Sequence, residues 1–497
     1  MTAVAGGGDS PGDALAPIEA VRLAGLKMVP VEPLDPEHFT SVLTEQQMGE
    51  VREVTAIASE MLRGRTIWHV NSTDKGGGVA EMLTALLPYA RGAAVDVRWV
   101  VIEGDPEFFR ITKRIHNHLH GQDGDSPRLS EADRRHYEAV LSARAESLRA
   151  LVHREDFIVA HDPQTAGLLP LLTAECGGLA WRCHVGVDTP NDRVRAAWDF
   201  LRRYVRSADA IIFSRKQFVW DGLEDCRVEI VAPSIDPFTA KNRPISDAGV
   251  AAILAATGLI EQPVPSTDPA TFERRDGTTS PIRHRAEVTE SRRLEPSARL
   301  VVQVSRWDTL KDPVGVLEGF RRRVIPRCDA DLVLAGPSVA EVADDPEGYG
   351  VYANVQDAWR RLDDRERGRV HLASLPMDDA EENAAMVNAL QRRAEVVVQK
   401  SLAEGFGLTV AEAMWKSRPV VASAVGGIQD QIVDGVSGVL IRDPHDLDGF
   451  GDAVGDVLTD SARAASLGRA AHERVRDHFL GTRSLLQYAE LLLSLRR

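Results

Sequence analysis

The sequence predicts an α/β protein whose two doubly wound, Rossmann-like domains face a cleft. Short apolar runs rich in β-branched residues alternate with longer segments of helical spacing along most of the chain, which is typical of parallel sheets covered by helices. The length of 497 residues exceeds one ordinary core and indicates two or three domains. A proline-punctuated stretch without a clear period, residues 233–244, separates two alternating halves.

These patterns divide the chain into four segments. We expect a disordered tail over residues 1–15, a first Rossmann-like domain over 16–236 and a second over 237–470. The remaining residues, 471–497, are predicted to form a C-terminal helix that can cross back to the first domain. The first residues lack the basic start and apolar core of a signal peptide, and no apolar run is long enough to span a membrane. We therefore expect a cytoplasmic protein without a membrane partner.

Composition narrows the function classes. The 74 acidic side chains outnumber the 59 basic ones and give a formal charge of −15, which argues against a general nucleic-acid or membrane-surface role. Any anion site must therefore be built from local groups. The four cysteines are scattered without a C-x-x-C pair, so neither a zinc ribbon nor a disulfide framework is indicated. They are Cys176, Cys183, Cys226 and Cys328.

Six apolar runs of the first half are predicted to be the strands of its sheet, with segments of helical spacing between them. The predicted strands are residues 66–70, 95–102, 157–162, 179–185, 210–213 and 228–231. The predicted helices are residues 34–63, 79–87, 107–121, 130–154, 164–173 and 190–206. This alternation favours a parallel sheet with helices on both faces.

A glycine-rich loop follows the first strand of this half. Asn71 begins the loop, and Gly76, Gly77 and Gly78 close it before the next helix. Successive glycines let the backbone fold under a ligand without side-chain clashes, and open α/β sheets bind ligands at the carboxyl ends of their strands. A plain flexible turn is the alternative interpretation.

Two later strands of the first half end in polar residues. His161 and Asp162 close one strand, and His184 lies near the end of the next. A lone histidine is more often structural than catalytic, but two from successive strands beside a carboxylate favour a ligand cleft.

Three further histidines, His116, His118 and His120, lie on a predicted helix. Only the first and the third share a helix face, and no carboxylate is placed to complete a ligand set. We therefore expect a polar, cleft-facing or solvated helix here and no metal site.

The second half repeats the alternation of strands and helices. A long segment rich in proline, threonine and arginine, residues 261–296, precedes its sheet and is predicted to be an extended loop or hairpin insertion. The predicted strands are residues 299–305, 331–335, 370–373, 396–399 and 419–422. The predicted helices are residues 247–256, 447–458 and 461–496.

A pair of cations follows the first strand of this half. Arg306 and Lys311 stand five residues apart, and Pro313 indicates that a helix begins directly after them. Arginine offers a planar fork and lysine a point charge, so the pair can clamp a diphosphate beside the helix start. Ordinary surface charge is the alternative interpretation.

Residues 396–414 are predicted to form a strand, a glycine loop and a helix that starts at a ligand site. The first N–H groups of such a helix lack internal partners and attract anions. Glu404 and Glu412 can accept hydrogen bonds from hydroxyls but repel phosphate, so the pattern suits a nucleotide sugar. Thr409 precedes Glu412 by three residues, and completing a capping box with Thr409 is the alternative role of Glu412.

The segment EGFGLTVAEAM, with Glu404 and Glu412 eight residues apart, resembles the donor-site signature of the retaining glycosyltransferases of family 4, which have the glycosyltransferase B fold. The resemblance implies that Glu404 meets the donor sugar and that Glu412 holds the ribose hydroxyls. It also implies a donor-binding loop and helix start between the two glutamates, made of Gly405, Phe406, Gly407, Leu408 and Thr409.

More of the chain is similar to the trehalose glycosyltransferring synthases of that family, through HVNSTDKGGGVAEML, AHDPQ, WRCHVGVDTPN and SRWDTLKDP. The resemblance implies retaining, reversible transfer of glucose from ADP-, UDP- or GDP-glucose to free glucose, which makes trehalose. No cofactor or essential metal is implied, and a homodimer is one assembly that the sequence allows. The implied catalytic residues are His184, Arg306, Lys311 and Glu404. The implied acceptor-side residues are Asn71, Gly76, Gly77, Gly78 and Asp162.

Three other functions remain open on the residues alone. A retaining trehalose phosphorylase has a similar pattern and uses inorganic phosphate instead of a nucleotide. A sugar-nucleotide epimerase can share the fold without needing an acceptor. A non-catalytic module can bind a nucleotide sugar without turning it over.

Overall fold

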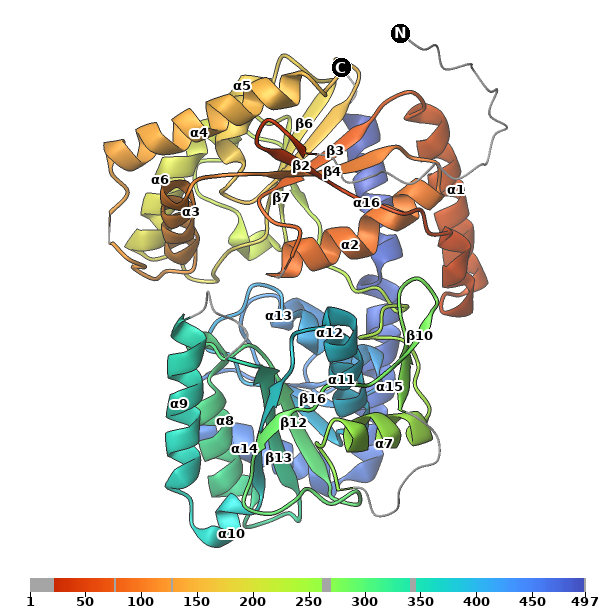
Figure 1. The fold of residues 1–497 in the computed structure, drawn as a ribbon, viewed down its shortest axis with the longest axis vertical. Coiled ribbons are helices and arrows are strands. Elements are labelled where there is room, and N and C mark those ends of the chain that lie inside the picture. The colour runs from red at the N-terminus through yellow and green to blue at the C-terminus, as the bar shows by residue number, and fades with distance from the viewer. Residues whose placement is uncertain (1–21, 76, 127, 262–269, 340–345, 496–497) are drawn as a thin grey trace. The chain divides into compact units, whose positions relative to one another are not determined.

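The computed structural model describes residues 22–75, 77–126, 128–261, 270–339 and 346–495 (Figure 1). The chain divides into two compact units, Met1–Ser234 with Gly481–Arg497 and Ile235–Leu480. Both are α/β units with mainly parallel sheets, as the sequence predicts. The predicted tail, residues 1–15, lies outside the described residues.

The first unit is built on an eight-stranded sheet in the order β1-β2-β4-β3-β5-β6-β7-β8. Its strands are β1 (Arg22–Leu23), β2 (Leu26–Val29), β3 (Ile67–Asn71), β4 (Val97–Ile102), β5 (Phe157–His161), β6 (Gly178–Cys183), β7 (Ala210–Phe213) and β8 (Val228–Ile230). The six predicted strands correspond to β3 through β8, which pair in parallel. Strands β1 and β2 form an antiparallel edge hairpin that is too short to give a periodic signal. The strand order reverses at β3, and ligands of open α/β sheets bind at such reversals.

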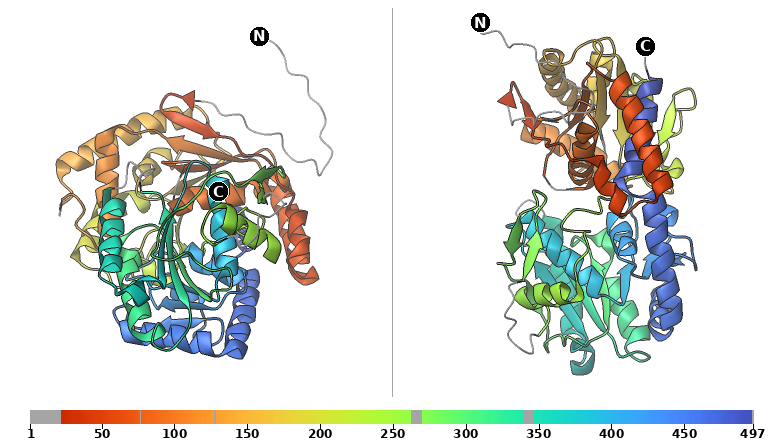
Figure 2. Two further views of the ribbon diagram at one scale, coloured as in Figure 1. Left: turned by 60° about the horizontal axis from the view of Figure 1, so that its bottom comes forward. Right: turned by 90° about the vertical axis from the view of Figure 1, so that its right-hand side faces the viewer.

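Two layers of helices cover this sheet (Figure 1). Helices α1, α2 and α16 pack on one face, and α3 to α6 pack on the other. Figure 2 shows α16 alongside α1. The helices are η1 (Pro36–Ser41), α1 (Glu45–Met61), α2 (Gly77–Gly92), α3 (Pro106–Leu119), α4 (Glu131–Arg149), η2 (Ala166–Leu168), α5 (Leu169–Leu172), α6 (Asp192–Val205), η3 (Lys216–Phe218) and α16 (Gly481–Ser494).

Strand residues alternate between the two helical layers, as the two-residue period of a strand requires. In β3, Trp68 and Val70 join the core beneath α3 to α6. Ile67 of the same strand joins the core beneath α1, α2 and α16, together with Phe157 and Val159 of β5. The same alternation decides which side chains of β3, β5 and β6 face α16.

Two helix predictions in and near this unit are wrong in detail. The segment predicted as one helix over residues 34–63 contains η1 and then α1, because the capping box of Thr44 starts a new helix. The predicted C-terminal helix over residues 471–497 is also two helices. The first, α15 (Ser461–His478), belongs to the second unit, and a break at Phe479 separates it from α16 of the first unit.

The second unit is built on a seven-stranded sheet in the order β11-β14-β13-β12-β15-β16-β17. Its strands are β11 (Glu287–Thr289), β12 (Leu300–Val304), β13 (Asp331–Pro337), β14 (Val370–Leu375), β15 (Val396–Gln399), β16 (Val420–Ser423) and β17 (Val439–Ile441). Strand β11 runs antiparallel to β14, and the other described pairs are parallel. The strand order reverses between β12 and β15, so the loops after these two strands lie at the expected ligand position.

Helices cover both faces of this sheet as well (Figure 1). They are α7 (Asp247–Ala256), η4 (Thr309–Lys311), α8 (Pro313–Gly319), the π-helical η5 (Phe320–Val324), α9 (Pro346–Arg360), α10 (Asp364–Arg367), α11 (Ala380–Arg393), α12 (Leu408–Trp415), α13 (Ile428–Gln431), α14 (Leu447–Thr459) and α15. None of the helices in the described ranges has the length and apolar character that crossing a bilayer requires.

The insertion predicted over residues 261–296 contains a hairpin in its described part. Strands β9 (Thr271–Glu273) and β10 (Thr279–Pro281) pair antiparallel, and β11 then joins the main sheet. Arg274 anchors the hairpin through ion pairs to Asp379 and Glu381 near the start of α11.

Candidate active site

The loops after β12 and β15 meet at the carboxyl edge of the second sheet. These strands are direct neighbours, and the N–H of Leu402 donates to the carbonyl of Leu310 at 2.7 Å. Lys311 and Glu404 are thereby brought together, with Nζ 2.5 Å from Oε2. Their side chains are only 16% and 9% exposed. The sequence placed both residues in a donor site, and the structure joins them directly.

A second ion pair lies beneath the first. Lys400, whose side chain is 0% exposed, follows β15 and pairs with the carboxylate of Asp312. Asp312 has left-handed backbone (φ 45°), and its Oδ1 caps α8 by accepting from the N–H of Gly315 at 3.0 Å. No local sequence pattern predicts this pair, because Lys400 stands alone at the end of an apolar run and Asp312 resembles an ordinary helix cap.

Arg306 occupies a different position from Lys311. Its side chain is 67% exposed, and Nη2 lies 3.1 Å from Oδ2 of Asp308. Oδ1 of Asp308 accepts from the N–H of Leu310 at 2.8 Å. The loop therefore presents one exposed cation and one enclosed cation, instead of two equivalent ones.

Helix α12 does not start as predicted. Its N-cap is Gly407, in the left-handed region at φ 83°, and Thr409 lies inside the helix with its hydroxyl donating to Oε1 of Gln399 at 3.2 Å. The capping box of Thr409 and Glu412 is therefore wrong. Glycine adopts positive φ at little cost, so the helix begins earlier, and a glycine cap offers no side chain to its first N–H groups.

The loop before α12 is packed against residues 424–427. The N–H of Gly427 donates to the carbonyl of Gly405 at 2.8 Å. A Cβ atom on Gly426 would lie 1.7 Å from the carbonyl oxygen of Glu404. Only glycine permits this approach, and the contact restricts the backbone that carries Glu404 and Phe406.

Glu412 lies in α12 with 1% of its side chain exposed, and its Oε1 is 3.4 Å from Nζ of Lys241. Beside it, Nζ of Lys416 contacts Oε1 of Gln391 at 2.8 Å and Oδ1 of Asn242 at 3.1 Å. Burial lowers the pKa of Lys416 to about 7. The sequence analysis missed Lys241 and Lys416, because both are single lysines in segments without a motif.

In the first unit, the loop after β3 is held in place by polar contacts. Oδ1 of Asn71 accepts from Nε1 of Trp99 at 2.8 Å, and its amide donates to the carbonyl of Thr73 at 2.6 Å. Helix α2 starts at Gly77, whose φ is 79°, and includes Gly78. Gly76 lies outside the described residues.

Asp162, a predicted acceptor-side residue, and His184, a predicted catalytic residue, are in direct contact. Oδ1 of Asp162 accepts from the backbone N–H of His184 at 2.8 Å. Asp162 has left-handed backbone (φ 63°), and its carbonyl accepts from Nε1 of Trp181 at 3.0 Å. Burial raises the pKa of Asp162 to about 7. Asp162 therefore positions the backbone that carries His184.

His184 is the outermost member of a row of three histidines. Its Nε2 lies 3.1 Å from Nδ1 of His161, and Nε2 of His161 lies 3.0 Å from Nδ1 of His69. Burial lowers the pKa of His69 to about 3, and those of His161 and His184 fall well below the usual value for the same reason. All three are therefore neutral at physiological pH.

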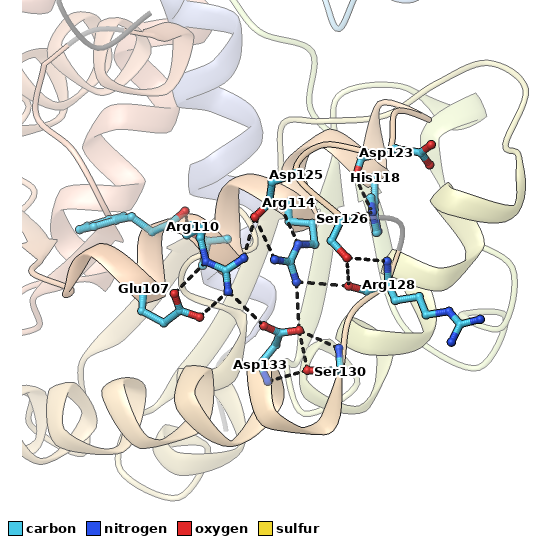
Figure 3. A network of polar contacts seen from close by, with 12 residues as sticks. Glu107, Arg110, Arg114, His118, Asp123, Asp125, Ser126, Arg128, Ser130 and Asp133 are labelled. Atoms are coloured by element: carbon cyan, nitrogen blue, oxygen red, sulfur yellow. Dashed lines mark hydrogen bonds and ion pairs between the residues drawn. The ribbon is translucent and has the colours of Figure 1, made fainter. Parts of the chain in front are cut away.

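His118 of α3 belongs to a structural network of polar contacts (Figure 3). Nε2 of His118 lies 3.1 Å and 3.0 Å from the carbonyl oxygens of Asp123 and Ser126. Arg114 pairs with Asp125 and Asp133 in the same network. Within the described ranges, no group of three or more His, Cys, Asp or Glu side chains is arranged to hold a metal ion.

The two Rossmann-like units have the architecture of the glycosyltransferase B fold, and two family models identify the chain as a glycosyltransferase. The protein-family model for "Trehalose synthase, N-terminal domain" matches residues 69–220. The family model for "Glycosyl transferases group 1" matches residues 285–474. A trehalose synthase of Pyrococcus horikoshii is 34% identical over 460 residues, which are 92% of this chain and 96% of that protein. The chain belongs to the family of trehalose synthase-like glycosyltransferases.

Two further comparisons set the limits of this similarity. A trehalose phosphorylase of Pleurotus sajor-caju is 27% identical over 458 residues, covering 86% of this chain and 58% of that protein. The solved structure of an α,α-trehalose-phosphate synthase (UDP-forming) from Burkholderia vietnamiensis has a TM-score of 0.62 at 16% identity. It covers 87% of this chain and 99% of that one, and it supports the fold alone.

Proposed function

We propose that the protein transfers glucose from a nucleoside-diphosphate glucose to free glucose and so forms trehalose, reversibly and with retention at the anomeric carbon. The observation that carries the proposal is the contact of Lys311 with Glu404 beside the start of α12. In this proposal the ammonium of Lys311 binds phosphate and the carboxylate of Glu404 binds sugar hydroxyls, so their contact supports a donor that carries both groups. The trehalose synthase relative, which matches nearly the whole chain, supports the choice of product.

Lys311, Arg306 and the N-terminus of α12 hold the donor diphosphate in this proposal. The enclosed ammonium of Lys311 contacts a phosphate oxygen, and the exposed guanidinium of Arg306 turns from Asp308 to another. Preorganised positive groups at the leaving diphosphate stabilise the charge that develops there. Their combined charge makes a metal ion unnecessary for departure of the diphosphate, so activity persists in a chelator.

Glu404 accepts hydrogen bonds from the donor sugar in this proposal. Lys311 and the hydroxyl of Ser401, which donates to Glu404 at 3.3 Å, hold the carboxylate in one orientation. Glu412 accepts from the ribose hydroxyls and exchanges its contact with Lys241 for them. Adenine, uracil and guanine remain the candidate bases.

The transfer step uses no enzyme carboxylate as a nucleophile. The bond between the anomeric carbon and the diphosphate oxygen breaks while the acceptor hydroxyl forms its new bond on the same face. The acceptor proton passes to the leaving phosphate oxygen, which balances the reaction. His184, Asp162 and the loop at Gly77 and Gly78 orient the sugars from the first unit.

A retaining trehalose phosphorylase is the second candidate, favoured by the similarity to the Pleurotus enzyme. In that reaction inorganic phosphate takes the place of the nucleotide at the same cationic groups. The products from trehalose and phosphate are then glucose 1-phosphate and free glucose.

The deciding experiment is a donor panel of ADP-, UDP- and GDP-glucose with glucose as acceptor. We expect one donor to release its diphosphate and form α,α-trehalose, identified by the anomeric signals in NMR. Phosphate-dependent glucose 1-phosphate formation from trehalose identifies the phosphorylase instead. Isomerised donor without disaccharide identifies an epimerase, and bound donor without release identifies a binding module. Either of these last two results refutes the transfer.

A further inference from the structure

Three imidazoles form a continuous chain across three neighbouring strands of the first sheet. His69 lies within β3, His161 ends β5, and His184 follows β6. These strands are adjacent in the order β3-β5-β6. Consecutive rings are stacked, with centroids 5.3 Å and 5.4 Å apart. The chain therefore runs from inside the sheet to its carboxyl edge.

The chain lies on a sheet face that is mainly apolar. The neighbours on this face include Ile67, Val159 and Ala180, packed beneath α1, α2 and α16. Buried polar groups destabilise a core unless they are hydrogen-bonded. His161 is fully buried, and each of its ring nitrogens contacts a neighbouring imidazole. The two outer histidines therefore supply the hydrogen-bond partners of the middle one.

Arg182 and Tyr488 complete the surroundings of the chain. Arg182, on the same sheet face, donates to the hydroxyl of Tyr488 and to the carbonyl of Val231, the latter at 3.1 Å. Tyr488, from α16, meets the ring of His69 edge-on with centroids 6.0 Å apart. The positive charge of Arg182 disfavours protonation of all three histidines, in addition to burial. Asp162 is the acidic group beside the chain, and it contacts the backbone of His184.

In such a chain the tautomer of each neutral imidazole depends on the tautomers of its neighbours. Each carries one N–H and one lone pair, so His161 must donate through one nitrogen and accept through the other. Both hydrogen bonds consequently run in the same direction. The nitrogen that is protonated in His69 therefore decides which nitrogen is protonated in His184.

The surroundings of His69, at the inner end of the row of histidines, determine the direction of both hydrogen bonds. Nδ1 of His69 faces His161, and Nε2 has no hydrogen-bond partner within the described ranges. His69 lines an apolar pocket together with Leu86 and Leu492. Buried N–H groups without an acceptor are rarer in folded proteins than acceptors without a donor, which favours a lone pair at this nitrogen. His69 then donates from Nδ1 to His161, and His161 donates from Nδ1 to His184.

We propose that His69 and His161 are positioning residues that hold His184 as the tautomer with its proton on Nδ1. The outermost imidazole then presents a fixed hydrogen-bond donor. This inference rests on the proposed function, in which His184 contacts the transferred sugar. Neither His69 nor His161 touches substrate in this scheme.

The direct test is ¹⁵N NMR of the whole protein with labelled histidine and without substrate. We expect the His184 ring, assigned by comparison with His184→Gln, to show a protonated Nδ1 and an unprotonated Nε2 at pH values near neutrality. In His161→Phe the same ring should change to a protonated Nε2 or to a mixture. A protonated Nε2 in the wild-type protein overturns the proposal, and so does an unchanged tautomer in His161→Phe.

Kinetics supply the second readout. We expect His161→Phe to lower kcat roughly tenfold with little change in donor KM, because only the orientation of one contact is lost. His161→Gln, which can donate and accept at once, should recover part of the loss and keep the test available if His161→Phe does not fold. His118→Phe is the matched control, since it removes a buried imidazole of the same unit outside the chain. Equal losses in His161→Phe and His118→Phe, or no recovery with His161→Gln, contradict the positioning role.

Failure of the proposed function is recognised separately. The NMR measurement needs no turnover. If the protein shows the expected tautomer but makes no trehalose, the proposed reaction is refuted and the positioning role of the histidines stands. If the protein makes trehalose but His184 has the opposite tautomer, only the positioning role of His69 and His161 is refuted.

Discussion

The buried ammonium of Lys400 is paired with the carboxylate of Asp312, beneath the two loops that carry Lys311 and Glu404. Lys400 follows β15, whereas Asp312 caps α8 after β12. The pair therefore ties together the ends of two strands that are neighbours in the sheet but nearly ninety residues apart in the chain. We infer that it sets the spacing of the phosphate group and the sugar group above it.

Breaking this pair is expected to destabilise the second unit strongly. Asp312→Asn keeps the helix cap and tolerates the left-handed backbone, but it leaves the ammonium of Lys400 buried without its carboxylate. Removing one partner of a buried pair typically costs about 3–5 kcal/mol. Urea unfolding of the variant measures this loss.

The chain offers a matched control in Asp446. Its Oδ1 also caps a helix by accepting from a glycine N–H, that of Gly449, at 2.8 Å. The cap is exposed, and Asp446 forms no ion pair with the residues that the structure describes. Asp446→Asn should change stability by less than about 1 kcal/mol. Similar losses in both variants contradict a stabilising role of the ion pair between Lys400 and Asp312.

Glu404→Ala is expected to abolish transfer while the fold persists. The side chain makes its polar contacts with Lys311 and Ser401 at the edge of the sheet and contributes little to the core. We expect kcat/KM to fall by about a thousandfold or more, equivalent to about 4 kcal/mol of transition-state stabilisation. Circular dichroism checks the fold, and Glu318→Ala, which removes an ion-paired carboxylate of α8, is the control. Near-normal turnover in Glu404→Ala removes the central assignment.

Lys311 and Arg306 are expected to differ in their kinetic effects, because one is enclosed and the other exposed. Lys311→Ala removes a fixed charge beside the leaving group and should lower kcat about a hundredfold. Arg306→Ala removes a mobile charge and should mainly raise the donor KM, by about tenfold. Steady-state kinetics with the donor varied separates the two. Arg360→Ala, at another exposed arginine, should change neither parameter, and identical profiles for Lys311→Ala and Arg306→Ala contradict the distinction.

Asp162 makes stability depend on pH. Because burial raises its pKa in the folded state to about 7, the folded protein binds more protons than the unfolded chain between the usual aspartate range and pH 7. The stability from this group is therefore fully present below the usual aspartate range and is lost as the pH rises from that range to about 7, by at most about 1.4 kcal/mol per pH unit.

Asp162→Asn tests this dependence. Asparagine keeps the shape and tolerates the left-handed backbone, but it does not titrate. Unfolding of both proteins at pH 5, 6, 7 and 8 should show that the wild-type protein loses stability relative to the variant over this range. A constant difference between the two across the series rules out titration of Asp162 in the folded protein.

Local sequence patterns determined most of the secondary structure of this protein. Buried parallel strands are continuous apolar runs, so β3, β5 and β15 are visible without any knowledge of their neighbours. The start of α12 was placed wrongly, because Gly407 and Thr409 are both acceptable caps and the packing of residues 424–427 decides between them. Cap choice depends on a contact that no local pattern contains.

The family resemblance predicts one site for Glu404 and Lys311, and the structure shows that their side chains are in contact. Only the tertiary structure decided three other pairings near the predicted sites. They are Lys400 with Asp312, Lys241 with Glu412, and His69 with His161. The physical reason is that periodicity and motifs report on residues a few positions apart, whereas these contacts depend on strand order. Strand order brings the ends of β3, β5 and β6, and those of β12 and β15, to a common edge.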